Sequence, residues 1–281
     1  LASFSGWSLF GGVANTAASQ GLNVLMNIFF GVTVNAAFGV ASQVNAAVYS
    51  FVGNFQIAFK PQIVKSYAAQ ERKYFMDLII NTSKYSYFLL FIICMPLYVC
   101  CEEVLSLWLT EVPPYAVSFC RLMLIFSLLD AIQGPLWISV QATGKIRNYQ
   151  LLMGVMILSN LPISYLFLKL GFLPDIVLVV KVVMNVLIFV ARITYLNRLF
   201  SFPIIRFMRE VLVRVFVVTL LSCLCIIFLP TTSDDFISIL YIVCISLIIN
   251  GLLILIVGVN KKERALVINQ LEKFLNSNKY Q

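Results

Sequence analysis

The chain has no histidine and few charged residues. Only 11% of its 281 residues are Asp, Glu, Lys or Arg, whereas soluble domains carry about 25%. The lack of His removes the commonest general base and the commonest metal ligand. The motifs of zinc proteases, serine hydrolases and nucleotide-binding P-loops are also absent. We therefore expect no catalytic residues, no metal site and no cofactor, and any energy must come from a gradient, a partner or the flux of a substrate.

Hydrophobic residues make up 61% of the chain and form long runs. A membrane-spanning helix needs about 20 mostly apolar residues. Eight segments meet this requirement: 6–30, 34–58, 77–101, 116–141, 148–170, 174–196, 211–229 and 236–259. The sequence therefore predicts an all-α, polytopic membrane bundle of eight transmembrane helices joined by short connectors.

The basic residues are concentrated in alternate connectors. Sixteen of the 20 Lys and Arg lie in 59–75, 142–149, 192–214 or the tail after 260, whereas the other connectors carry acidic residues. By the positive-inside rule, the basic set is cytoplasmic, and both termini of this chain are then cytoplasmic. The net charge of +8 thus reflects membrane topology, and we expect no nucleic-acid partner. Two partly apolar basic segments, Pro61–Ala68 and the tail, are expected to lie along the inner surface.

A polar stripe runs along the first predicted helix. Asn15, Ser19, Asn23 and Asn27 are spaced by four residues, so on a helix they share one face. Such a face is costly in lipid, and it must meet other helices or a water-filled cavity. Hydrogen bonding between helices is the simpler interpretation, and a substrate cavity is the alternative.

A few charged residues lie inside the predicted spans. Lys181 is the best candidate for a functional cation, because it shares a helical face with Asn185. Lys84 and Arg121 are further candidates, although each is near enough to a helix end to reach the membrane surface. Asp130 is the one deeply placed carboxylate; it either pairs with a cation to fix packing or takes up and releases a proton.

The helix that carries Asp130 also contains Pro135 directly after Gly134. A proline inside a helix removes one backbone hydrogen bond. We therefore expect a kink in this helix.

Several short motifs in the first 70 residues resemble a known transporter family. They are GWSLFG at 6–11, QGLN at 20–23, NIFFG at 27–31, NAAFGVASQV at 35–44 and PQIVKSYA at 61–68. These runs are similar to the polysaccharide-transporter branch of the multidrug/oligosaccharidyl-lipid/polysaccharide exporter superfamily. The rest of the chain agrees with this family in helix count and topology.

The resemblance implies a MATE-like architecture of two six-helix lobes around a central cavity. Residues 1–200 would form the second lobe, and 201–281 would add two transmembrane helices and a cytoplasmic tail. The chain begins with Leu, and we expect it to be the later part of a longer protein whose N-terminal lobe is missing here.

The resemblance also implies a function and a set of partners. Such proteins are not enzymes; they move undecaprenyl-diphosphate-linked oligosaccharides across the bacterial cytoplasmic membrane for surface polysaccharides such as lipopolysaccharide. Expected partners are this substrate, membrane lipid, the N-terminal lobe and polysaccharide assembly proteins. The sugars would meet the polar stripe, and the phosphates would meet Lys181, with Arg121 or Lys84; Asn185 would also line the substrate cavity. Asp130 would be the ion-coupling group.

Other functions are open at this stage. A cation-coupled multidrug antiporter of the same superfamily needs cavity carboxylates, for which Asp130 is the one candidate. A lipid-II-type flippase for peptidoglycan is a close relative. A membrane-embedded glycosyltransferase or polymerase usually has large outer loops with catalytic residues, and none is present in this sequence.

Overall fold

The computed structural model describes residues 2–227, 236–260 and 263–264. Over these residues the chain is entirely helical and has no strand. Six of its helices are long and apolar enough to cross a membrane. The prediction of an all-α fold is thus confirmed over the described residues, and the long apolar helices are compatible with a multi-pass membrane bundle. The expected surface helix in the tail and the connector at 228–235 lie outside the described residues.

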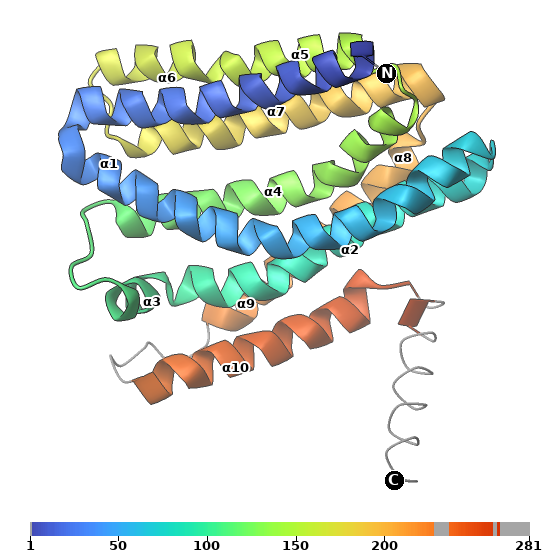
Figure 1. The fold of residues 1–281 in the computed structure, drawn as a ribbon. Helices are drawn as coiled ribbons and strands as arrows, with labels where there is room; N and C mark the ends of the chain where they lie inside the picture. The colour runs from blue at the N-terminus through green and yellow to red at the C-terminus, as the bar shows by residue number, and fades with distance from the viewer. Residues whose placement is uncertain (1, 228–235, 261–262, 265–281) are drawn as a thin grey trace, which may run out of the picture.

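The helices form layers arranged around α4 (Figure 1). The first part of α1, with α5, α6 and α7, forms one layer; the second part of α1 packs with α2 and α4; α10 lies outermost against α2 and α9. The elements are α1 (Ala2–Ala68), α2 (Arg72–Val99), α3 (Cys101–Trp108), α4 (Ala116–Ala142), α5 (Arg147–Leu158), α6 (Asn160–Lys169), α7 (Asp175–Phe200), α8 (Ile204–Phe207), the π-helical turn η1 (Met208–Leu212), α9 (Val213–Ile227), α10 (Phe236–Leu253) and the π-helical turn η2 (Ile254–Gly258).

The helix α1 consists of two arms that meet at Gly31. This residue has a non-helical backbone, with φ of 77° and ψ of −171°, a conformation that residues with a Cβ rarely adopt. The chain reverses direction there (Figure 1). The first arm (2–30) and the second arm (32–68) each contain one of the predicted apolar segments.

Two local features differ from the sequence prediction. Pro61–Ala68 is not a separate surface helix but continues the second arm, because Ile63 and Ser66 are buried and hold it against the bundle. The short helix α3 was not predicted; it follows α2 after one residue and buries Cys101 and Leu105.

The segment predicted as one helix at 148–170 is interrupted near a polar residue and a proline. It forms α5 and α6, which are separated at Ser159, one residue before Asn160. Pro162, in the first turn of α6, lacks the N–H that would continue the hydrogen-bond ladder. The Ser159 hydroxyl donates to the Val155 carbonyl at 2.8 Å, so the break retains a local polar contact.

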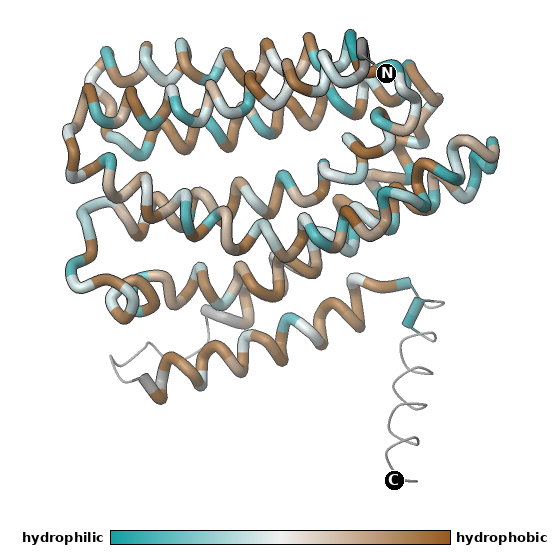
Figure 2. The backbone as a smooth tube through the Cα atoms, viewed as in Figure 1, coloured by the Kyte–Doolittle hydropathy of each residue, from teal (hydrophilic) through white to brown (hydrophobic). Residues whose placement is uncertain are grey.

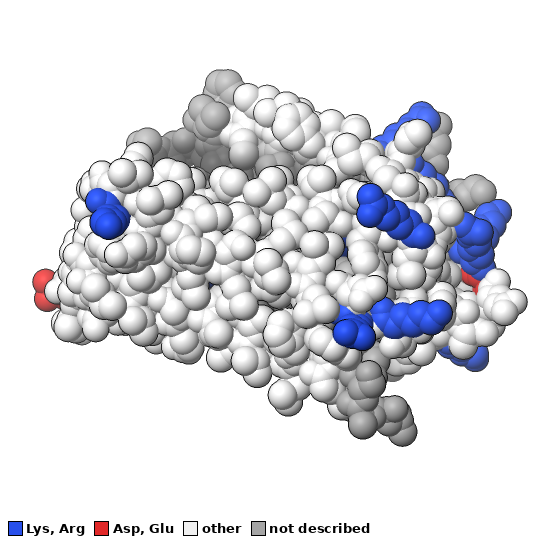
Figure 3. All heavy atoms as spheres, turned by 90° about the horizontal axis from the view of Figure 1, so that it is seen from above, with Lys and Arg blue, Asp and Glu red and all other residues white. Residues whose placement is uncertain are grey.

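The two ends of the bundle differ in charge. The basic end holds the connectors α1–α2, α4–α5 and α7–α8, and Lys and Arg gather there (Figures 1 and 3). The acidic end holds α3, the loop 109–115 and the connector 170–174, with acidic residues Glu102, Glu111 and Asp175. Between the ends, α10 is apolar along nearly all of its length, whereas polar residues interrupt both arms of α1 (Figure 2).

A proline in α4 is compensated by a side chain from α1. Pro135 cannot donate to the carbonyl of Ala131, four residues earlier. The buried Gln56 amide donates to that carbonyl at 3.0 Å and to the Ser86 hydroxyl of α2 at 3.1 Å. α4 is one continuous helix from Ala116 to Ala142, so Pro135 does not interrupt it where the kink was expected. Gln56 therefore joins α1, α2 and α4. It also gives the Ala131 carbonyl a hydrogen-bond donor, which lipid could not supply.

We expect Gly134→Ala to destabilise the bundle. A Cβ at Gly134 would collide with the Gln56 amide, which would displace it from the Ala131 carbonyl. Overpacking of this kind costs about 1–3 kcal/mol. Thermal unfolding of the purified protein in detergent should show a lower Tm. Gly53→Ala is the matched control, because a Cβ at Gly53 meets open space; an equal loss of stability in both variants would contradict this role of Gln56.

Candidate functional site

A cluster of polar side chains connects α4 and α7 inside the bundle. We define the central polar cluster as Asp130, Gln133, Lys181, Asn185 and Arg192. Gln133 donates to the Asn185 side-chain oxygen at 2.6 Å, and the Asn185 amide donates to Asp130 at 3.3 Å. Arg192 donates to the backbone carbonyl of Gln133 at 2.9 Å. Amide, carboxylate and guanidinium are therefore linked across one helix interface.

Helical spacing explains how these residues come together. Asp130 and Gln133 are one turn apart on α4, and Lys181, Asn185 and Arg192 follow one face of α7. The sequence predicted the face on α7 and the carboxylate on α4. It missed Gln133, which is buried and makes the shortest contact of the cluster. Its spacing of three from Asp130 is the signal that would have found it.

Lys181 has no strong hydrogen-bond acceptor among the described residues. Its Nζ lies 3.5 Å from the Met123 sulfur and 4.3 Å from the centre of the Phe126 ring. Among the described residues no carboxylate oxygen lies within 4.0 Å of it, although Asp130 is its nearby acidic neighbour. Sulfur and ring contacts are weak substitutes for an anion, so this ammonium retains donors for another group.

The second arm of α1 reaches the same region of α4. Asn45 accepts a hydrogen bond from the Ser127 hydroxyl, and the Tyr49 hydroxyl interacts with the Asp130 carboxylate. The carboxylate thus contacts α1 as well as α7. In the part of the chain that the structure describes, Asp130 forms no ion pair.

The polar stripe of the first arm faces away from the other helices of this chain. Asn15, Ser19 and Asn27 are exposed, Asn23 is half-buried, and none of the four side chains hydrogen-bonds with a described residue. The buried face of the same arm is formed by another series spaced by four, namely Ala14, Ala18, Leu22 and Met26. The stripe and the central polar cluster share no hydrogen bond.

The second arm of α1 also has an exposed polar face. Gln43, Ser50 and Asn54 are all exposed there, at spacings of seven and four that keep them on one side of a helix. Of these three side chains, only the Ser50 hydroxyl hydrogen-bonds with a described residue, the Ala47 carbonyl, at 2.7 Å. Both arms thus present polar groups on surfaces that no described helix covers.

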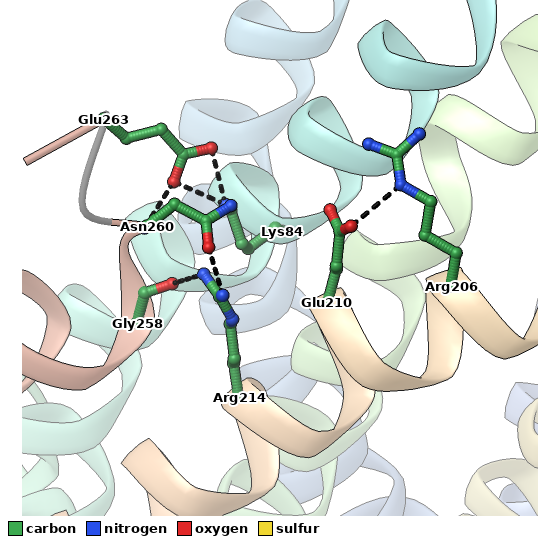
Figure 4. A network of polar contacts seen from close by, with 7 residues as sticks. All are labelled: Lys84, Arg206, Glu210, Arg214, Gly258, Asn260 and Glu263. Carbon is green, nitrogen blue, oxygen red and sulfur yellow. Dashed lines mark hydrogen bonds and ion pairs between the residues drawn. The ribbon is translucent and has the colours of Figure 1, made fainter. Parts of the chain in front are cut away.

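Lys84 lies in a separate network near the basic end (Figure 4). Its side chain is 0% exposed, and its Nζ contacts both Glu263 oxygens at 2.8 Å. Arg214 of α9 donates to the Gly258 carbonyl at 3.3 Å and to the Asn260 side chain. These contacts hold the segment after η2 against α2 and α9. Among the described residues Lys84 forms no hydrogen bond with the central polar cluster, and its charge is committed to Glu263.

Arg121 lies at the other end of the bundle. Its Nε donates to the Tyr98 carbonyl at 3.2 Å, and its guanidinium lies 5.5 Å from the centre of the Tyr98 ring. It lines an open cavity beside α3 and the start of α4. The three candidate cations therefore occupy three different places, and of these three only Lys181 adjoins the Asp130 carboxylate and the amides of the central polar cluster.

Comparisons with protein-family models, curated proteins and solved structures found no match for this chain.

We expect Glu263→Gln to destabilise the protein, because it leaves the fully buried Lys84 without a counter-ion. Loss of one partner of a buried pair costs about 3 kcal/mol or more, measurable as a lower Tm in detergent. Glu210→Gln is the matched control; its pair with Arg206 is partly exposed, and Arg206 retains Asp77, so a loss of about 0.5 kcal/mol is expected. Equal effects of the two variants would contradict the ion-pair interpretation.

The same pair predicts a dependence on pH. Burial alone would raise the pKa of Glu263, but the hydrogen bonds from Lys84 and the Asn260 amide outweigh it and hold that pKa below the ordinary value of 4.5. The stabilisation is thus complete above pH 4.5 and is lost as the pH falls through the lower pKa of the folded protein. Melting curves of Glu263→Gln should lack this acid-dependent component.

Proposed function

We propose that this chain is part of a translocator of lipid-diphosphate-linked oligosaccharides in a bacterial cytoplasmic membrane. In this proposal residues 1–200 form the second six-helix lobe of a MATE-like transporter, and 201–281 supply two further helices and a cytoplasmic tail. The substrate is an undecaprenyl-diphosphate-linked oligosaccharide used for surface polysaccharide, and the chain itself performs no chemical reaction. The family resemblance of the first 70 residues suggests this assignment, and the distribution of polar groups supports it.

The observation that carries the proposal is the ammonium of Lys181, which lies beside a network of amides and forms no ion pair among the described residues. A diphosphate-sugar headgroup needs cations for the phosphates and amides or hydroxyls for the sugars. Lys181 and Arg192 supply two cations to one carboxylate, Asp130, within the central polar cluster. The Gln133 side-chain oxygen is buried and has no hydrogen-bond partner among the described residues, which favours a polar ligand or water at this place.

The uncovered polar faces of α1 support a larger assembly. Asn15, Ser19 and Asn27 would lie against lipid if this chain acted alone, and such groups are costly there. An N-terminal lobe facing α1 across a water-filled cavity would remove that cost. The stripe would then line the path of the sugars.

The proposed topology has eight spans. The two arms of α1, then α2, α4, the pair α5 and α6, α7, the run from α8 to α9, and α10 pass alternately between the basic and acidic ends. With the basic end in the cytoplasm, both termini of this chain are cytoplasmic.

A second candidate function is a cation-coupled drug antiporter. Asp130 favours it, because this half-buried carboxylate accepts a hydrogen bond from Asn185 but has no ion pair among the described residues. A bound cation, however, would meet Lys181 and Arg192 nearby. The anionic headgroup therefore fits the charge of the cluster better.

The test is Lys181→Ala in the complete transporter, reconstituted in vesicles with a fluorescent lipid-diphosphate-linked oligosaccharide. Loss of the phosphate-binding cation should lower the translocation rate at least about tenfold, the effect of about 1.4 kcal/mol on a barrier. Lys169→Ala is the matched control, since Lys169 is exposed near the acidic end, and its rate should be unchanged. Normal translocation by Lys181→Ala would remove this residue from the mechanism.

The antiporter alternative is separated by Asp130→Asn and a cationic fluorescent dye. If dye efflux depends on Asp130 while lipid-linked oligosaccharide is not moved, the antiporter function holds instead. If oligosaccharide moves and dye does not, the headgroup proposal holds, and the effect of Asp130→Asn on its ion dependence tests the coupling role.

A further inference from the structure

The acidic end contains an open cavity of about 750 Å³ between α3, the loop 109–115 and α4. This volume is within the range of small-molecule sites. Its polar and aromatic lining consists of Tyr98, Glu102, Ser106, Tyr115, Ser118 and Arg121. None of these residues belongs to the central polar cluster, and only Arg121 was singled out by the sequence.

Contacts with Tyr98 hold the Arg121 side chain in place, but they occupy only part of its hydrogen-bonding capacity. Its Nε donates to the Tyr98 carbonyl at 3.2 Å, and the guanidinium rests over the Tyr98 ring. The two terminal nitrogens have no hydrogen-bond partner among the described residues, and no described carboxylate lies within 4.0 Å. The guanidinium is therefore held through its Nε, and its terminal N–H groups are available as donors.

Two tyrosine rings border the cavity. Tyr98 is 37% exposed and Tyr115 is 38% exposed. Tyr115 has a left-handed backbone, with φ of 69°, which costs free energy for a residue with a Cβ. Its ring stacks on Phe119 with centroids 6.0 Å apart, so packing holds it at the margin of the cavity. Flat rings of this kind offer apolar surface together with a hydroxyl.

The charge of the lining selects among ligand classes. Glu102 and Arg121 are its two ionisable side chains of opposite sign, and Ser118 also hydrogen-bonds Asp175 at 2.5 Å. A phosphate or an acidic sugar would meet these carboxylates, and a cation would meet Arg121. A neutral ligand rich in hydroxyls can accept from Arg121, donate to Glu102 and pack its C–H faces on the rings.

We propose that this cavity is a binding site for neutral saccharides. Arg121, Glu102 and Ser106 provide the hydrogen bonds, and Tyr98 and Tyr115 provide the apolar contacts. This proposal rests on the proposed function, because the saccharide would be the sugar portion of the transported lipid. It adds a place at the acidic end where that sugar portion is held away from the membrane interior.

The test measures binding of soluble saccharides to the full chain, purified in a zwitterionic detergent without a sugar headgroup. Maltohexaose and chitohexaose are the neutral probes, tetragalacturonate is the acidic probe, and inorganic diphosphate is the phosphate probe. Saturation-transfer NMR should show binding of a neutral probe, and titration should give a Kd about tenfold weaker or more in Tyr98→Ala and in Arg121→Gln. Trp108→Ala is the control, because Trp108 is 52% exposed on α3 but does not line the cavity. A melting curve of each variant checks folding, and Arg121→Lys provides a second, milder change at the same position.

Three results would overturn the proposal. The first is no binding of either neutral probe, and the second is equal binding by wild type, Tyr98→Ala and Arg121→Gln. The third is tighter, Arg121-dependent binding of tetragalacturonate or diphosphate, which would make this an anion site. Vesicle translocation separates the two proposals: neutral-probe binding without Lys181-dependent transport keeps the saccharide site and rejects the proposed function, whereas transport without probe binding does the reverse.

Discussion

The packing of α1, α2 and α4 depends on how one backbone carbonyl is satisfied. Pro135 leaves the Ala131 carbonyl of α4 without its helical donor, and inside a membrane no water replaces that donor. The Gln56 amide supplies it and also reaches Ser86. Because Gly134 has no Cβ, the amide can approach α4 closely. This contact fixes the position of the second arm of α1 on α4. It thereby also aligns Asn45 and Tyr49 with the face of α4 that carries Ser127 and Asp130.

Polar groups in this bundle fall into two kinds. Some have a partner within the bundle, such as Lys84 with Glu263 and Ser222 with Asn250, and these contacts hold the segment after η2 against α2 and join α9 to α10. Others retain unused hydrogen-bonding capacity, such as Lys181 and the exposed stripe of α1. The first kind is explained by stability alone. The second kind raises the energy of an isolated bundle in lipid, and a functional role accounts for why those side chains occupy their positions.

Hydropathy and spacing were sufficient to locate the apolar helices, because membrane thickness and helical rise fix their length. The same periodicity predicts that Lys181 and Asn185 share one face, and in the structure both side chains contact α4. Contacts between distant segments could not be predicted in this way. Lys84 and Glu263 are separated by 179 residues, and nothing local in either segment indicates the other. The helix α3 was hidden for a different reason: its apolar start at Cys101 continues the hydrophobic run of α2, so hydropathy shows one element where the backbone forms two.

The geometry of the first arm limits what can lie opposite it. Its inward series Ala14, Ala18, Leu22 and Met26 is committed to the bundle, so Asn15, Ser19 and Asn27 cannot turn inward without exposing those apolar groups within the protein. Rotation of the arm therefore does not relieve the exposure of the stripe. Only a second surface or a water-filled space can do so. A tightly packed apolar helix would leave the amides unpaired, whereas a polar surface across water would hydrate them and keep them accessible to hydroxyl groups. The sequence of α1 thus favours a separated, hydrated boundary over a closed helix seam.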